Sequence, residues 1–155
     1  MDRYPSETED ISKVIDGYEQ TYKKLDRPPK DDYYLNIAKA VSMRSTCLKR
    51  QYGAVIVNND EIIATGYNGN PRGMPNCLDM CYCPRMTKPH NSGDYSNCGS
   101  VHAEQNAMLS ASRRDMLGGT LYLYGREGGK EIQAEPCPIC KRMIRNSGLK
   151  RIVCL

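Results

Sequence analysis

The chain has 155 residues and a formal net charge of +4, with 22 Lys and Arg against 18 Asp and Glu. This length suits one domain, and no apolar run approaches the roughly 20 residues of a membrane span. The mild positive charge suits a phosphorylated small molecule and does not require a nucleic-acid partner, so no nucleic acid is expected. The acidic start MDRYPSETED excludes a signal peptide. We therefore expect a cytoplasmic protein with no membrane segment.

Residues 1–29 form a polar N-terminal extension with one predicted helix. Apolar residues recur at steps of three and four between Thr8 and Leu25, which predicts a helix over that stretch. Two prolines end it. Residues 30–155 then form a single domain, and its first predicted helix runs from about Asp31 to Met43.

The segment GAVIVNNDEIIATGYNGN predicts a β-hairpin with strands Ala54–Val57 and Glu61–Tyr67. The following segment, 68–100, shows no hydrophobic periodicity and contains four cysteines and His90. A loop of this length in a compact domain is functional, disordered or tied by a metal. The thiols favour the metal, and we call residues 70–100 the Cys-rich insert.

The last third of the chain alternates helices and strands. Strands linked by helices predict a parallel pair within a three-layer α/β/α sandwich. The expected elements are a helix over VHAEQNAMLSASRRDML, a strand at Thr120–Tyr124, a polar loop GREGGKEIQAE at 125–135, a helix at Pro136–Ser147 and a strand at Leu149–Leu155.

Three residues suit a catalytic zinc site. His102 opens one predicted helix, and Cys137 and Cys140 open another, with a spacing that puts both thiols on one helical face. Three protein ligands leave one tetrahedral position open, as in catalytic zinc sites. Glu104 is placed to carry a proton to and from a water that the zinc activates. A lone CxxC or His is weak evidence, but H-x-E followed by P-C-x-x-C is the signature of zinc nucleobase deaminases.

The motifs VHAEQNAML and PCPICKRMIRNSGLKRIV, with GAVIV and GYNG upstream, resemble the cytidine/deoxycytidylate deaminase superfamily over about residues 33–155. RSTC before GAVIV and the Cys-rich insert resemble its deoxycytidylate (dCMP) deaminase branch. The resemblance implies a five-stranded mixed sheet with flanking helices and a homo-oligomer, from dimer to hexamer. It also implies a hydrolase of the cyclic amidine C–N bond, converting dCMP to dUMP and ammonia. Many relatives respond to dCTP and dTTP, which makes these nucleotides candidate effectors.

The resemblance assigns the same roles to the zinc ligands and to Glu104 as the motif does. It also implies that Asn68 binds the sugar and that the backbone of Ala103 contacts the pyrimidine ring. Arg72, in GNPRG beside Asn68, is the residue that we predict to contact the phosphate. An exposed loop arginine without a ligand is the alternative interpretation of Arg72.

The dCMP deaminase branch often carries a second, structural zinc, and this chain has thiols at the matching positions. A zinc ion bound by four thiolates would stabilise a loop that has little hydrophobic core of its own. Free thiols, some of them buried, are the alternative. The predicted ligands are Cys47, Cys77, Cys83 and Cys98, with Cys81 or His90 as alternates to Cys83.

Two departures from the family pattern affect these expectations. Relatives run almost directly from the third strand into PCxxC, so we expect segment 125–135 to cover or reshape the mouth of the active site. Relatives also continue through another helix and strand, so we expect a mixed sheet of four or five strands.

Two other functions stay open from the sequence. One is a deaminase of another nucleoside or nucleotide, or of single-stranded nucleic acid. The other is a non-catalytic, zinc-stapled binding protein active in DNA uptake or regulation. Glu104 argues against the second, because a purely structural zinc site has no use for that carboxylate.

Overall fold

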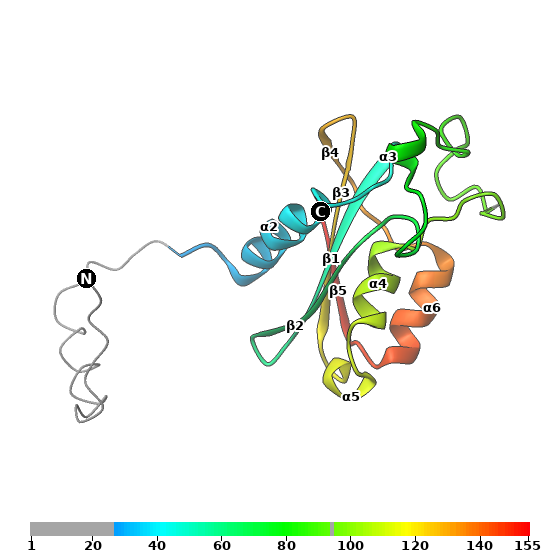
Figure 1. The fold of residues 1–155 in the computed structure, drawn as a ribbon. Helices are drawn as coiled ribbons and strands as arrows, with labels where there is room; N and C mark the ends of the chain where they lie inside the picture. Colours follow the sequence, from blue (N-terminus) through cyan, green and yellow to red (C-terminus); the bar gives the residue numbers. More distant parts are fainter. Residues whose placement is uncertain (1–26, 94) are drawn as a thin grey trace, which may run out of the picture.

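A computed structural model describes residues 27–93 and 95–155, so the predicted helix at 8–25 lies outside the described residues. No helix in the described ranges is both long and apolar enough to cross a bilayer. The elements follow in chain order as α2 (Lys30–Ser42), β1 (Arg50–Asn58), β2 (Glu61–Tyr67), α3 (Cys77–Met80), α4 (Ala103–Leu109), α5 (Arg113–Met116), β3 (Thr120–Glu127), β4 (Lys130–Ile132), α6 (Pro138–Ser147) and β5 (Arg151–Cys154) (Figure 1).

The strands form one mixed five-stranded sheet in which β2, β1 and β3 are neighbours. Strand β1 runs antiparallel to both β2 and β3, whereas β5 runs parallel to β3, so the predicted parallel pair is confirmed. Strand β4 pairs with residues 125–127 of β3, and β5 pairs with residues 120–123. Both lie along the β3 edge that faces away from β1, so β4 and β5 share that edge.

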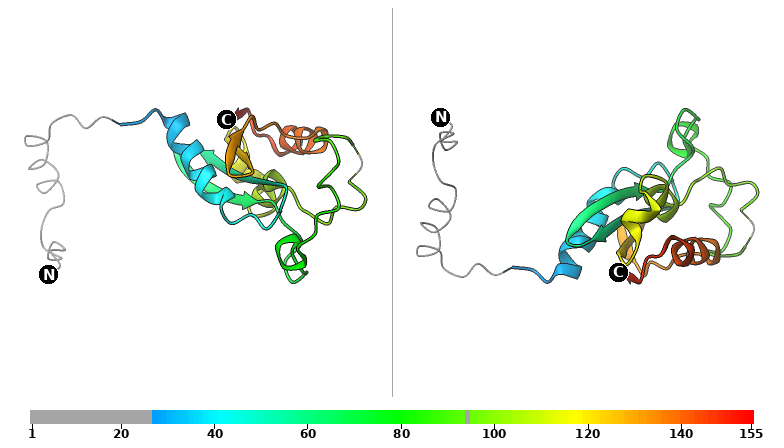
Figure 2. Two further views of the ribbon diagram at one scale, coloured as in Figure 1. Left: turned by 90° about the horizontal axis from the view of Figure 1, so that it is seen from above. Right: turned by 90° about the horizontal axis from the view of Figure 1, so that it is seen from below.

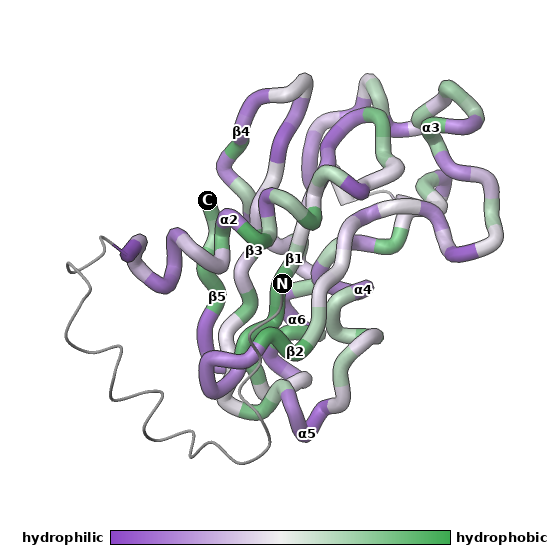
Figure 3. The backbone as a smooth tube through the Cα atoms, turned by 60° about the vertical axis from the view of Figure 1, so that its left-hand side comes forward, coloured by the Kyte–Doolittle hydropathy of each residue, from purple (hydrophilic) through white to green (hydrophobic). Residues whose placement is uncertain are grey.

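Side chains alternate between the two faces of the sheet, as the two-residue period of a strand requires. One face packs on α2 and contains Val55 and Tyr122, and the other contains Ile56 and Leu121 and packs on α4 and α6. Figure 2 shows α2 on one side of the sheet and α6 on the other. The central strands are largely hydrophobic in Figure 3, whereas the hairpin around β4 is largely hydrophilic. The three-layer sandwich predicted from the sequence is confirmed.

Two glycines let helices approach the β1–β2 hairpin closely. A Cβ atom on Gly53 would lie 2.0 Å from the carbonyl oxygen of Ala38 in α2. A Cβ atom on Gly66 would lie 2.3 Å from the backbone nitrogen of Ala107 in α4. Because α4 starts immediately after His102, its backbone contact with β2 helps to fix where His102 lies.

The prediction of a single helix after His102 is wrong, because the structure has two short helices there, α4 and α5. The break follows from serine side chains that bond to the backbone. Ser110 Oγ donates to the Asn106 carbonyl oxygen at 3.0 Å. Ser112 Oγ accepts from the backbone N–H of Asp115 at 3.1 Å and so caps a new helix.

The prediction of a polar loop at 125–135 is also wrong for the first half of that segment. Strand β3 continues to Glu127, and β4 returns from Lys130 as an antiparallel partner. Between them Gly128 and Gly129 have φ angles of 57° and 80°. Two adjacent residues with positive φ form the tight turn that matches the twist of a hairpin, and glycine adopts that conformation without steric cost.

Candidate active site

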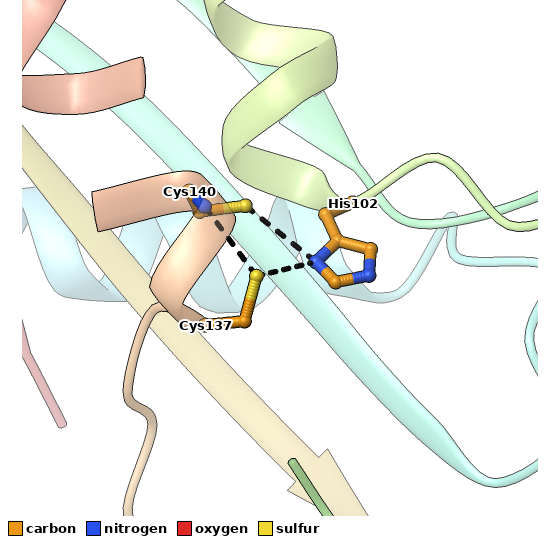
Figure 4. A group of neighbouring side chains, drawn as sticks. All are labelled: His102, Cys137 and Cys140. Atoms are coloured by element: carbon orange, nitrogen blue, oxygen red, sulfur yellow. Dashed lines mark hydrogen bonds between the residues drawn. The ribbon is translucent and has the colours of Figure 1, made fainter. Parts of the chain in front are cut away.

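The three predicted zinc ligands meet between the starts of α4 and α6 (Figure 4). His102 Nδ1 lies 3.5 Å from Cys137 Sγ and 3.5 Å from Cys140 Sγ. All three ligand atoms lie within 4.8 Å of one another. Neighbouring ligands of a tetrahedral ion with bonds of about 2.0–2.3 Å lie roughly 3.5 Å apart. The spacing and the donor set therefore fit zinc.

The start of α6 turns both of its thiols to the same side. Cys137 is the N-cap residue, and its Sγ accepts from the backbone N–H of Cys140 at 3.4 Å. Pro138 follows at the first helical position, where the missing N–H has no cost. On the other helix, Gln105 Oε1 accepts from the His102 backbone N–H at 2.9 Å and fixes the residue before α4.

Glu104 lies in the first turn of α4, is 5% exposed and lines the same pocket as His102 and Cys137. Burial raises the pKa of its carboxyl group, against a smaller lowering by its own backbone N–H and the Cys140 thiol. Burial also raises the pKa of Cys140, as do the negative charges of Glu104 and Cys137. A divalent cation would offset this crowding of acidic groups.

Asn68 lines the pocket and is bonded to the start of β1. Its Oδ1 accepts from the Tyr52 backbone N–H at 2.7 Å and from Ser45 Oγ at 2.7 Å, and its Nδ2 donates to the Arg50 carbonyl oxygen at 2.9 Å. Within the described part of the chain, this bonding uses one of the two amide N–H groups and leaves the other for a ligand.

Lys49, Arg50 and Arg85 line the pocket together with His90, and we call these four residues the basic cluster. Burial lowers the pKa of His90, and Arg50, Lys49 and Arg85 lower it further, while Glu127 acts in the opposite direction. Arg50 Nε bonds to Glu127 Oε2 at 2.9 Å, so the β3–β4 hairpin holds one member of the cluster in place.

Sequence reasoning missed the basic cluster as a binding feature. The signals were present as LKR after RSTC and as CPR in the Cys-rich insert. No local pattern brings these two segments together, because the contact depends on how the insert folds back over β1. Lys49 Nζ donates to the Arg85 carbonyl oxygen at 3.0 Å and forms part of that contact.

Two other predicted contacts, Arg72 and Ala103, are not part of the pocket lining within the described residues. Arg72 is exposed in the Cys-rich insert. Ala103 is fully buried as the first residue of α4, between His102 and Glu104.

The thiols predicted for a second zinc share one neighbourhood. Burial raises the pKa of Cys47 to about 11, with further contributions from Cys77, Cys98 and Cys83. Cys47 Sγ also lies 3.2 Å from Ser100 Oγ. Among the described residues, only the His102 group brings three or more ligand atoms within 4.8 Å, so these four thiols are neighbours at a wider spacing.

The two alternates for the second zinc lie in different surroundings. Cys81 is exposed, and its Sγ lies 3.6 Å from the Leu78 carbonyl oxygen. His90 stacks on Tyr52, with ring centroids 6.2 Å apart and an interplanar angle of 27°. Its charged neighbours include the other members of the basic cluster, Glu127 and Glu135.

Comparisons with known proteins agree with this site. The model of the cytidine and deoxycytidylate deaminase zinc-binding region matches residues 28–155. A deoxycytidylate deaminase of Mycobacterium phage D29 is 39% identical over 135 residues, covering 83% of this chain and 96% of the relative. The Saccharomyces cerevisiae deoxycytidylate deaminase is 38% identical over 144 residues, covering 91% of this chain and 42% of the relative.

Solved structures give the same result. The apo crystal structure of dCMP deaminase from cyanophage S-TIM5 matches with a TM-score of 0.60 and 28% identity, covering 82% of each chain. The structure of that enzyme in complex with dCMP and dUMP matches with a TM-score of 0.59 and 27% identity, covering 83% of this chain and 82% of the other. With a family model that spans most of its length and relatives above 30% identity, this chain belongs to the cytidine and deoxycytidylate deaminase zinc-binding family.

Proposed function

We propose that this protein hydrolyses dCMP to dUMP and ammonia. The observation that carries the proposal is the His–Cys–Cys donor group, with the buried carboxylate of Glu104 in the same pocket. The basic cluster lines that pocket too, which suits a substrate with a phosphate group. The phage and yeast relatives bear the name deoxycytidylate deaminase, which supports the same substrate.

His102, Cys137 and Cys140 would hold the zinc. A zinc ion so bound supplies a Lewis acid that lowers the pKa of a coordinated water to about 7. Glu104 accepts a proton from the attacking water and delivers it to N3 of the cytosine. It then moves the proton of the new C4 hydroxyl group to the departing amino group, which leaves as ammonia. Its buried site excludes solvent from these transfers.

The remaining contacts are proposed from the pocket lining and from the resemblance to the family. The free N–H of the Asn68 amide is the proposed donor to the sugar, and the backbone of Ala103 is the proposed contact of the ring. We assign the 5′-phosphate to Arg50 and Arg85, because both line the pocket and arginine can bind phosphate through two parallel hydrogen bonds. Arg72 stays as the alternative phosphate contact.

An assay of ammonia release tests the substrate. It compares dCMP, CMP, deoxycytidine, cytidine and a short single-stranded DNA. Each charge-assisted hydrogen bond to the phosphate contributes roughly 1.5–3 kcal/mol. We therefore expect kcat/KM for dCMP to exceed that for deoxycytidine by at least about 10²-fold. Equal rates with and without the phosphate would contradict the nucleotide assignment, and turnover of DNA alone would indicate a polynucleotide deaminase.

Paired variants locate the phosphate contact. Arg50→Ala should raise KM for dCMP about 10-fold or more and leave the weak activity on deoxycytidine unchanged. Arg72→Ala is the matched control, because it removes an exposed arginine outside the pocket lining. The reverse result would assign the phosphate to Arg72.

A structural zinc at Cys47, Cys77, Cys83 and Cys98 is part of the proposal. It is supported by the neighbouring thiols Cys83 and Cys98, which help to raise the pKa of both Cys47 and Cys77. The homo-oligomer, regulation by dCTP or dTTP and a cytoplasmic location rest on the resemblance and stay predictions. Sedimentation analysis and assays with each nucleotide test the first two.

A further inference from the structure

One aromatic residue of the Cys-rich insert lies directly against the zinc-ligand group. The rings of Tyr95 and His102 have centroids 5.4 Å apart and an interplanar angle of 69°, an edge-to-face contact. Tyr95 also lines the pocket that contains Glu104 and Cys137. The function proposed above gives Tyr95 no role.

The two thiols contact the His102 ring at one edge. Its Nδ1 faces Cys137 and Cys140, and Nε2 lies on the opposite edge of the ring (Figure 4). Metal-bound histidines are commonly oriented by a partner outside the metal's own ligand set. Losing a hydrogen-bonded partner of this kind typically weakens metal binding or activity 10–100-fold.

Tyr95 is itself held in place by three neighbours. The Arg85 guanidinium group lies over its ring, 4.2 Å from the centroid. The Tyr95 hydroxyl donates to Asn91 Oδ1 at 3.1 Å, and the Tyr95 carbonyl oxygen accepts from the Cys98 backbone N–H at 2.9 Å. A side chain fixed at its face, its hydroxyl and its backbone can hold a neighbouring ring in one orientation.

We propose that Tyr95 is a positioning residue that orients the imidazole of His102 for zinc binding. The Cys-rich insert therefore supplies part of the metal centre's support as well as a wall of the pocket. The proposal rests on zinc at the His102 group, but not on the identity of the substrate, because the main measurement below reads zinc release without turnover.

The chain has only two histidines, so NMR of the histidine ring nitrogens can follow the catalytic zinc directly. A His90→Gln variant assigns the remaining ring signals to His102. Zinc-loaded protein is then titrated with a chelator until the His102 nitrogen signals reach their metal-free positions. A zinc at the four-thiol group does not contribute to these signals, because none of its four predicted ligands is a histidine.

We expect Tyr95→Leu to release zinc from His102 at a chelator concentration at least about 10-fold below that needed for the natural protein. Its kcat should fall by a similar factor. Tyr95→Phe keeps the ring and should behave like the natural protein. Tyr82→Leu is the matched control, since Tyr82 is a 62% exposed tyrosine of the same insert. Circular dichroism checks folding, and Tyr95→Met replaces Tyr95→Leu if the latter does not fold.

Two outcomes would overturn the proposal. In the first, Tyr95→Leu leaves the chelator midpoint and the His102 signals of the zinc-loaded protein where they were. In the second, KM for dCMP rises while kcat and zinc release stay unchanged, which would make Tyr95 a substrate contact. Normal zinc retention by Tyr95→Phe together with early release by Tyr95→Leu supports the proposal even if dCMP is not turned over.

Discussion

The two thiol groups of this protein are built differently. The His102 group takes its ligands from the starts of α4 and α6, which contact each other and pack on the same core. The four-thiol group takes its ligands from the segment after α2, from α3 and from the loop that follows it. Only the first group gathers its ligand atoms within 4.8 Å among the described residues. The fold therefore prepares the catalytic site, whereas the four-thiol group would need its metal to draw it together.

The largest expected effect separates chemistry from metal binding at the prepared site. Glu104→Gln should lower kcat by about 10²–10⁴-fold or more, because a neutral amide cannot accept the proton. Zinc content, measured by elemental analysis, and the unfolding temperature should stay close to those of the natural protein. Normal turnover by this variant would remove Glu104 from the proton-transfer role.

A smaller effect tests whether the four-thiol group depends on its metal. Fully loaded protein should contain about two zinc ions per chain, and Cys47→Ser or Cys98→Ser should reduce this to about one. At free zinc 100-fold above Kd, binding stabilises the fold by about 2.7 kcal/mol. Its loss should therefore lower Tm by about 5–10 °C in a domain of this size.

Cys81→Ser is the control for that measurement, because Cys81 is exposed and is not among the thiols that shift the pKa of Cys47. It should change neither the zinc content nor Tm. One zinc per chain, unaffected by Cys47→Ser, would remove the structural site.

The smallest effect concerns Cys154, a thiol that belongs to neither group. Burial raises its pKa from 9.0 to about 11, with smaller contributions from Glu104 and Glu135. The folded state therefore holds this proton more tightly than the unfolded state. The stabilisation is complete below pH 9 and is lost as the pH rises toward 11. Denaturant unfolding across this range should show the loss with or without added zinc, and Cys154→Ala should reduce it.

Tyr122 adds to the same alkaline decline, because burial and its hydrogen bond to Asp31 raise its pKa to about 12. Cys154→Ala combined with Tyr122→Phe should flatten the profile further than either change alone. A decline that disappears with zinc would instead point to thiols of the metal groups.

The grouping of His102, Cys137 and Cys140 could be predicted from the sequence because its information is local. The motifs H-A-E and P-C-P-I-C mark the segments that carry the ligands. The hydrophobic periodicity that follows each motif predicts that a helix begins there. The β1–β2 hairpin was predictable for the same reason, since two short apolar segments flank a short polar turn. The parallel pairing of β5 with β3 followed from the helix between them.

Other features were missed because their local signals were ambiguous or because they depend on the path of a distant segment. The hairpin at Gly128–Gly129 had a usable signal, two adjacent glycines between short strands, but its polar composition favoured a loop. The break between α4 and α5 involves Ser110 and Ser112. Serine can cap a new helix or lie within one, so the sequence does not show which of the two occurs. The basic cluster depends on the path of the Cys-rich insert, which lacks periodicity and so gives no clue to where Arg85 and His90 lie.

The close approach at Gly66 shows that the geometry of the metal centre also depends on a residue that is not a metal ligand. A methyl group at that position would meet the backbone of α4 at Ala103 and Ala107 and push α4 away from β2. His102 would then shift relative to Cys137 and Cys140, although every residue of the zinc motif would still be present. The alignment of the donor atoms thus depends partly on a glycine outside the motif. A motif search alone would accept a variant in which that glycine had been replaced.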